Sequence, residues 1–159
     1  MRPQKIALAI TFLAALAAAQ TPAMKTFASS SDVAAMIANA KAERKPDQPT
    51  FAQPILQLAP YTASLEYRAA VGPAALHETE AEMFYVIDGS ATLVTGGKLV
   101  NEKRNGVNLT GTAIEGGSAR AVAKGDFVIV PENTPHWFSP INGTIVLMSF
   151  HVPRPAPAH

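Results

Sequence analysis

From Pro46 onward the sequence divides into short segments that are rich in β-branched and aromatic residues and are bounded by Gly, Pro, Asn or Asp. Segments of this composition are typical of β-strands joined by turns. They read PILQLAP, YTASLEYRAAV, EMFYVIDG, SATLVTGG, KLVNEK, SARAVAKGD, DFVIVP and TIVLMSFHV. About eight short strands in roughly ninety residues predict an all-β fold, either an antiparallel sandwich or a barrel. A length of 159 residues allows one such domain.

One stretch, NEKRNGVNLTGTAIEGG at 101–117, interrupts the series of strands because it contains few apolar residues. We expect a long excursion or a β-hairpin over one rim of the domain. Long loops of this kind often carry function.

The N-terminal residues 1–19 have the pattern of a secretory signal peptide. Arg2 and Lys5 precede an uncharged apolar run, and Ala17 to Ala19 supply small residues for cleavage. The run is shorter than the ~18 apolar residues that a spanning helix needs. We therefore expect an exported protein, periplasmic or extracellular, with no stable membrane insertion after cleavage.

Residues 20–50 are expected to form one helix and a linker before the barrel at 51–153. The sequence SSSDVAAMIANAKAER places Val33, Met36, Ile37 and Ala40 on one face at helical spacing. Ser30, Ser31 or Asp32 can cap this helix, and its apolar face predicts packing against the outside of the barrel or against a second subunit. The last six residues, 154–159, form a tail that we expect to be disordered.

A first group of residues that could bind a metal or take part in catalysis surrounds the start of an apolar strand. Gly72 precedes His77, and Glu82 is followed by six residues and then Gly89. Because side chains alternate along a strand, an inward Glu82 implies that Phe84 and Val86 also point inward. Glu80 follows the same parity if the strand is already regular there, whereas His77 has the opposite parity and needs a bulge or a loop.

A second group lies later in the chain, where Gly125 is followed by five residues, Pro131, Asn133 and finally His136. The two groups together resemble the two motifs of the cupin superfamily over residues 52–152. The second cupin motif has glycine where this chain has Asn133, and asparagine is the residue that next best tolerates a left-handed turn. The resemblance implies a cupin jelly-roll barrel, which usually holds a metal ion.

The first motif departs from the cupin pattern, which has a His-x-His pair before the glutamate. Counted from Gly72, His77 takes the place of the first histidine and Thr79 replaces the second. Counted back from Glu82, His77 takes the second place and Ala75 replaces the first. Either way, one histidine is missing.

The resemblance implies that His77, Glu82 and His136 are the metal ligands, with Glu80 as a further candidate. Two histidines and a carboxylate suit a divalent transition metal: iron, manganese or zinc, with nickel or copper as alternatives. Glu80 and Glu82 are also candidates for a catalytic base. Glu78 is expected to face solvent.

Three further expectations concern residues near these motifs. His151 lies in the last strand, where we expect a structural histidine. Trp137 and Phe138 follow the motif histidine, so that one should pack inside and the other outside. Either Tyr67 or Arg68 is a candidate to line the pocket.

Composition and resemblance together limit the function. Thirteen basic and 12 acidic residues leave a net charge of +1, which gives no support for a nucleic-acid partner, and the absence of cysteine excludes thiol or disulfide chemistry. The resemblance implies a metal-dependent enzyme of the dioxygenase, isomerase or decarboxylase kind that acts on a small molecule, and a homodimer. A non-catalytic barrel that binds a small molecule or a metal, or a metal-free scaffold, is the alternative.

Overall fold

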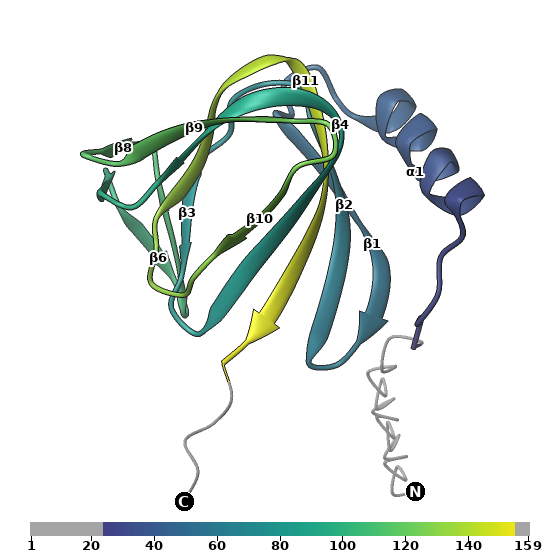
Figure 1. The fold of residues 1–159 in the computed structure, drawn as a ribbon, viewed down its shortest axis with the longest axis horizontal. Coiled ribbons are helices and arrows are strands. Elements are labelled where there is room, and N and C mark those ends of the chain that lie inside the picture. Colours follow the sequence, from purple (N-terminus) through teal and green to yellow (C-terminus); the bar gives the residue numbers. More distant parts are fainter. Residues whose placement is uncertain (1–23, 155–159) are drawn as a thin grey trace, which may run out of the picture.

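The two longest strands, β4 (Glu80–Thr95) and β11 (His136–Pro153), pair with each other in antiparallel register and join the two layers of the fold. The computed structural model describes residues 24–154, so the predicted signal peptide and residues 155–159 lie outside the described part of the chain. Figure 1 shows the strands curving around a common interior, with the helix on the outside.

The remaining strands attach to this pair. They are β1 (Thr50–Leu58), β2 (Tyr61–Arg68), β3 (Ala74–His77), β5 (Lys98–Val100), β6 (Lys103–Asn105), β7 (Asn108–Gly111), β8 (Ala113–Glu115), β9 (Ser118–Ala123) and β10 (Phe127–Val130). One layer contains β1, β2, β10 and the adjoining halves of the two long strands. The other contains β3, β6, β7, β9 and the remaining halves. The described strand pairings leave this jelly roll open rather than closing it into a complete barrel.

The sequence predicts two segments, EMFYVIDG and SATLVTGG, where the structure has the single strand β4. Gly89 lies at the bend between them with a φ of +82°, and a Cβ there would meet the carbonyl oxygen of Thr144 at 2.0 Å. Glycine therefore lets the strand change layers without ending. Asn133 has a φ of 56°, as expected for a residue in the place of the motif glycine.

The 101–117 region forms short strands, in agreement with the hairpin alternative. β6 and β7 pair across the Gly106–Val107 turn, and β7 continues the sheet by pairing with β3. β5 and β8 form a separate two-stranded sheet. This region consequently forms part of the wall beside His77, at the end of β3.

Helix α1 (Ser30–Glu43) packs on the outer face of β1, β2 and β11. Its cap is Ser29, one residue before the predicted candidates. Ser29 Oγ accepts a hydrogen bond from the Asp32 backbone, and the Asp32 carboxylate accepts one from the Ser29 backbone. In this reciprocal arrangement the capping residue lies three positions before its acidic partner. Because that partner is Asp32, the capping residue is Ser29. No helix within residues 24–154 has the length and hydropathy needed to cross a membrane.

The apolar core has two parts, one on each side of the layer that contains β2 and β11. The outer part lies under the helix and includes Ala40, Leu65 and Tyr67, with Val33, Met36 and Ile37 packed against it. The inner part lies between the layers: Phe84, Val86, Ala91, Leu93, Val122, Val130, Phe138, Ile145 and Leu147. The predicted helix face and the predicted inward stripe of β4 are both confirmed.

Candidate metal centre

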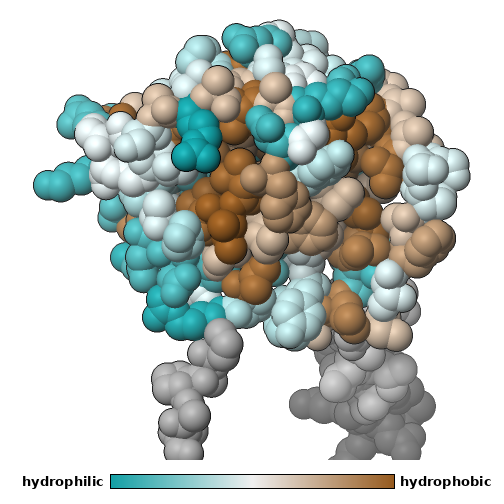
Figure 2. All heavy atoms as spheres, viewed as in Figure 1, coloured by the Kyte–Doolittle hydropathy of each residue, from teal (hydrophilic) through white to brown (hydrophobic). Residues whose placement is uncertain are grey.

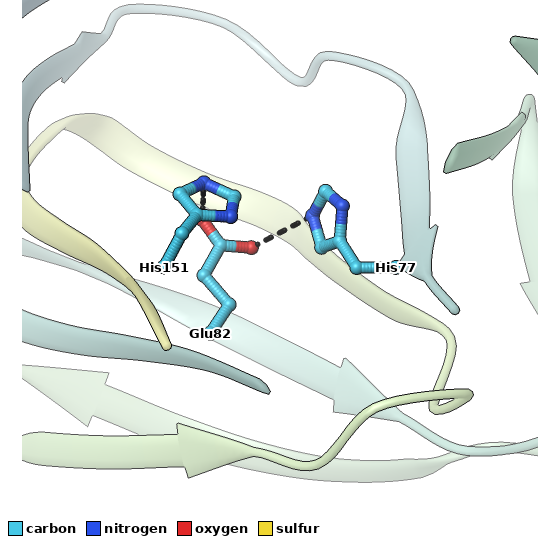
Figure 3. Close-up of side chains that lie close together, drawn as sticks. All are labelled: His77, Glu82 and His151. Atoms are coloured by element: carbon cyan, nitrogen blue, oxygen red, sulfur yellow. Dashed lines mark hydrogen bonds and ion pairs between the residues drawn. The ribbon is translucent and has the colours of Figure 1, made fainter. Parts of the chain in front are cut away.

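Four side chains from three strands meet at one end of the inner cluster. His77 ends β3, Glu82 lies near the start of β4, His136 begins β11, and His151 lies near the end of the same strand. Residues 78–79 lie between β3 and β4, outside both strands, so the alternation of side chains along a strand does not connect His77 with Glu82. His77 can therefore point inward together with Glu82. Figure 3 shows the Glu82 carboxylate between the imidazoles of His77 and His151.

Glu82 is the centre of this group. Its Oε2 lies 3.1 Å from His77 Nε2 and 2.9 Å from His136 Nε2. Its Oε1 accepts a hydrogen bond from Ser149 Oγ at 2.5 Å and lies 3.5 Å from His151 Nε2. A carboxylate buried this deeply is costly unless it is paired and hydrogen-bonded, and both of its oxygens have partners here.

Each imidazole turns its Nε2 toward Glu82 and its Nδ1 toward an oxygen farther out. The outer partners are Asn108 Oδ1 for His77 at 2.8 Å, the Thr134 carbonyl for His136 at 3.3 Å, and Glu80 Oε1 for His151 at 2.8 Å. Both nitrogens of each ring thus face an acceptor. An outer acceptor for Nδ1–H would leave the Nε2 lone pair available to a metal, as in histidines that ligate metals.

The environment changes the proton affinity of two of these groups. Burial alone would raise the pKa of Glu82, but the hydrogen bonds from His136, His77 and Ser149 outweigh it and hold this pKa far below the ordinary value. Burial alone would lower the pKa of His77, but its hydrogen bonds to Glu82 and Asn108 outweigh this and raise it. Glu82 is therefore an ionised carboxylate at neutral pH and a weak proton acceptor.

The group is buried on one side and reachable on the other. The side chains of His136 and Glu82 are 4% and 5% exposed, whereas those of His151 and Glu80 are 26% and 25% exposed. Phe84 closes the buried side, with its ring centroid 5.8 Å from that of His136. A small molecule approaching this end of the barrel would meet His151 and Glu80 first.

The structure brings together the three residues predicted as ligands, His77, Glu82 and His136. The fourth candidate, Glu80, lies outside them: its carboxylate contacts the Nδ1 atoms of His151 and, at 3.9 Å, His77. Glu78 forms an ion pair with Arg104 at the surface, away from the imidazoles.

Sequence reasoning expected a structural histidine at His151 and did not count it among the candidate ligands, although the structure places it beside them. Its Nε2 faces Glu82, and one ligand atom each from His77, Glu82 and His151 lie within 4.8 Å of one another. The available signal was its parity with Ser149, which makes the two a polar pair on one face of an otherwise apolar strand.

The other expectations divide between the two faces of the sheets. Phe138 is buried in the inner cluster, and Trp137 points the other way, where its Nε1 donates to the Gly72 carbonyl at 2.8 Å. Tyr67 packs in the outer cluster. Arg68 instead lies over the Phe138 ring, 4.7 Å from its centroid, and pairs with Glu66.

The donor set fits a divalent transition metal. Neutral imidazole nitrogen and carboxylate oxygen are ligands for iron, manganese, zinc, nickel and copper. Here three Nε2 atoms converge on one carboxylate, and each outer nitrogen already has an acceptor. Such outer partners orient the ligands and increase their basicity.

No model of a known protein family matches the sequence. No curated protein sequence matches it either.

Solved structures, by contrast, resemble the fold. The DMSP lyase DddQ from Ruegeria pomeroyi DSS-3 superposes with a TM-score of 0.54 at 16% identity, covering 87% of this chain and 70% of that one. The protein TT1209 from Thermus thermophilus gives a TM-score of 0.52 at 15% identity, covering 74% of this chain and 95% of that one.

A protein described as a Cupin 2 conserved barrel domain protein, from Salinispora arenicola CNS-205, gives a TM-score of 0.47 at 19% identity. The match covers 70% of this chain and 82% of that one. Identities this low speak only to the fold. With its mostly β jelly roll and the one helix of residues 24–154, the chain shares the fold of the first two of these structures, in agreement with the jelly roll that its two motifs predicted.

Proposed function

We propose that the protein is a metal-dependent enzyme that binds one divalent transition metal at His77, Glu82 and His136 and acts on a small organic molecule. The observation that carries the proposal is the convergence of imidazole Nε2 atoms on the buried Glu82 carboxylate. A metal bound here would supply a Lewis acid or a redox centre at neutral pH.

The side chains around the site have separate roles in this proposal. Glu82 balances part of the metal's charge, and Ser149 fixes the orientation of its carboxylate by donating to Oε1. Phe84 excludes water from the buried side, which strengthens electrostatic interactions within the site. Substrate enters past His151 and Glu80, the more exposed members of the group.

The reaction class follows from which groups can accept a proton. Glu82 is a weak base because its hydrogen bonds keep its pKa low. Glu80 is partly exposed and hydrogen-bonded to His151, so it is the better candidate to exchange a proton with a substrate at the mouth. We therefore favour chemistry of the dioxygenase, isomerase or decarboxylase kind, with Glu82 as a ligand. The lyase among the structural neighbours supports an enzymatic use of this fold.

A second candidate is a barrel that binds a metal or a small molecule without turning it over. The missing motif histidine favours it, since the departure lies in the ligand set itself. Metal binding separates the enzyme and the binding protein from a metal-free scaffold, and turnover separates the first two.

Protein purified without an affinity tag or chelator should contain close to one transition metal per chain by elemental analysis. His136→Ala should lose most of it while keeping the circular dichroism spectrum, because the apolar strands supply most of the burial. Oxygen consumption and product analysis with small phenolic, diketone and sugar-derived compounds would then test turnover. A wild-type protein that takes up no iron, manganese, zinc, nickel or copper would refute the proposal.

We also propose export to the periplasm or the extracellular space, on the basis of the charged, apolar and small-residue succession at 1–19. The mature protein from its native envelope should lack roughly these residues by intact-mass measurement. A mass that still includes them would refute export with cleavage.

A further inference from the structure

We infer that His151 ligates the metal in place of the histidine that the first motif lacks, and that Glu80 positions it. The inference rests on the proposed metal centre and completes its ligand set. It concerns a residue outside both motifs, on the last strand of the barrel.

The missing histidine leaves a gap that its own strand cannot fill. Ala75, which stands at one of the two candidate positions, has no ligand atom and lies opposite His136 in the sheet register. Thr79, at the other, lies in the turn between β3 and β4. A replacement must therefore come from another strand.

His151 lies on that other strand, directly opposite Glu82 in the antiparallel register of β4 and β11. Opposite residues on one face of a sheet have Cβ atoms about 4.5–5.5 Å apart, so their side chains extend side by side. Ser149, on the same face, already contacts Glu82. The register thus directs His151 to the carboxylate.

The two ring nitrogens of His151 are placed as those of a ligand would be. Nδ1 lies 2.8 Å from Glu80 Oε1, and Nε2 lies on the side of Glu82, 3.5 Å from its Oε1, where its lone pair would be available to a metal. His77 and His136 have the same arrangement with different outer acceptors. Three histidines from separate places in the sequence therefore share one orientation.

Three of these side chains have ligand atoms close to the spacing that one ion requires. Ligand atoms about 2.0–2.2 Å from one ion are about 3–4 Å from one another in the usual geometries. The ligand atoms of His77, Glu82 and His151 lie within 4.8 Å of one another, and the rings of His77 and His151 are nearly perpendicular, at 83°. The rings therefore converge edge to face, without stacking.

This placement also assigns Glu80. Its carboxylate contacts the outer nitrogens of His151 and His77, at 2.8 and 3.9 Å, rather than the inner ones. A carboxylate on the far nitrogen of a metal ligand orients the ring and raises its basicity. Glu80 is accordingly a positioning residue for His151 and not a ligand.

The test compares His151→Ala with Val152→Ala, a neighbouring change on the opposite, outward face. Binding of Zn²⁺ is measured by competition with a chelator, and X-ray absorption counts the imidazoles around the bound ion. We expect His151→Ala to weaken binding by at least 100-fold and to remove one imidazole, whereas Val152→Ala binds like the wild type. Circular dichroism checks that each variant is folded.

Glu80 has its own pair of variants. Glu80→Ala should weaken Zn²⁺ binding by about 10- to 100-fold. Glu80→Gln, which keeps an acceptor oxygen, should recover most of this loss. If Glu80 had only a structural role, Zn²⁺ binding and thermal stability would change together in the two variants. Recovery of Zn²⁺ binding in Glu80→Gln without a change in thermal stability would therefore show that Glu80 acts on the metal site.

The outcomes separate this inference from the proposed function. If the wild type binds Zn²⁺ and His136→Ala weakens binding, but His151→Ala keeps both the affinity and the imidazole count, then His151 is not a ligand and only this inference fails. If the wild type binds none of the five metals named above, both fail. Loss of one imidazole in His151→Ala supports both.

Discussion

The inner face shared by β4 and β11 has a polar end and an apolar end, built by the same two strands. At the polar end, Glu82 lies opposite His151. Farther along the same pair of strands, Val86 lies opposite Leu147, and both are fully buried. The alternation of side chains is the same at both ends, and only the residue types change.

The difference separates stability from chemistry. Burial of apolar surface stabilises the fold at one end. At the other, the buried Glu82 carboxylate needs hydrogen bonds to offset its lost hydration, and it receives one from Ser149. We therefore expect substitutions at the apolar end to unfold the protein, and those at the polar end to change metal binding and pH dependence.

The largest effect is expected at the apolar end. Phe84→Ala removes a fully buried ring that packs against Phe138 at a centroid distance of 5.1 Å. We expect a loss of about 3–5 kcal/mol in the free energy of unfolding, measured by urea denaturation. Tyr85→Ala, on the outward face of the same strand, should cost much less. Equal losses in the two variants would contradict the assignment of the core.

Asn108 should contribute to metal binding without being a ligand. It accepts a hydrogen bond from His77 Nδ1 across the β3–β7 pair, at 2.8 Å. Asn108→Ala should weaken Zn²⁺ binding by about 10- to 100-fold, as other losses of outer partners do. Thr110→Ala, exposed on the same strand, is the control. Unchanged affinity in Asn108→Ala would show that His77 is oriented without it.

Protons and metal should compete for the same nitrogens. Because the pKa of His77 is raised, its imidazole keeps a proton up to a higher pH than an ordinary histidine, and a metal must displace that proton to bind. The affinity for Zn²⁺ should therefore fall as the pH decreases through this pKa. The slope should reach about tenfold per pH unit for each displaced proton. Titration of Zn²⁺ affinity against pH measures it. In Asn108→Ala the fall should begin at lower pH.

The metal-free protein should show the opposite trend in stability. His77, whose pKa is raised on folding, stabilises the fold fully below its ordinary pKa of 6.5 and loses this contribution as pH rises through the folded value. Glu82, whose pKa is lowered, stabilises fully above its ordinary value of 4.5 and loses this as pH falls toward the folded value. Both contributions are therefore complete between 4.5 and 6.5. Urea denaturation of His77→Gln should lack the decline on the alkaline side.

The smallest effect on stability is expected on the outer surface. Phe127 and Ile129 on β10 are 58% and 59% exposed, beside Tyr85 on β4. Apolar side chains gather on this face of the molecule (Figure 2). Within residues 24–154, β10 pairs only with β4, so its other edge is open. An open apolar edge favours pairing with a second copy of the chain.

We therefore expect the wild type to sediment as a homodimer and Ile129→Lys to sediment as a monomer. Because Ile129 is exposed in the isolated chain, the substitution should change the free energy of unfolding of that chain by less than about 0.5 kcal/mol. Val107→Lys, at another exposed apolar position, should remain dimeric. A monomeric wild type would contradict the proposed pairing.

The sequence carried enough information to predict the fold. Strand composition and the second motif predicted the barrel, and simple alternation predicted that Glu82, Phe84 and Val86 share its interior. The number of segments was less accurate, because Gly89 has the local character of a turn although the long strand continues through it. Only the close approach of Thr144 reveals its use as a bend.

The candidate site was predicted less completely because it depends on pairings between distant strands. His151 faces Glu82 only through the register of β11 on β4, and no local pattern specifies that register. The contacts of Asn108 with His77 and of Glu80 with His151 depend likewise on strands that meet only in the folded chain. Motif spacing identified three of the four side chains that meet at the candidate site and did not identify His151 as a candidate ligand.

The most direct test of the polar end is an anomalous difference map from crystals of the metal-loaded protein, recorded at the absorption edge of the bound metal. We expect one strong peak per chain about 2.0–2.2 Å from Nε2 of His77, His136 and His151 and from a carboxylate oxygen of Glu82. A map from metal-loaded protein with no peak among these four side chains, or with its only peak at the surface, would contradict the account.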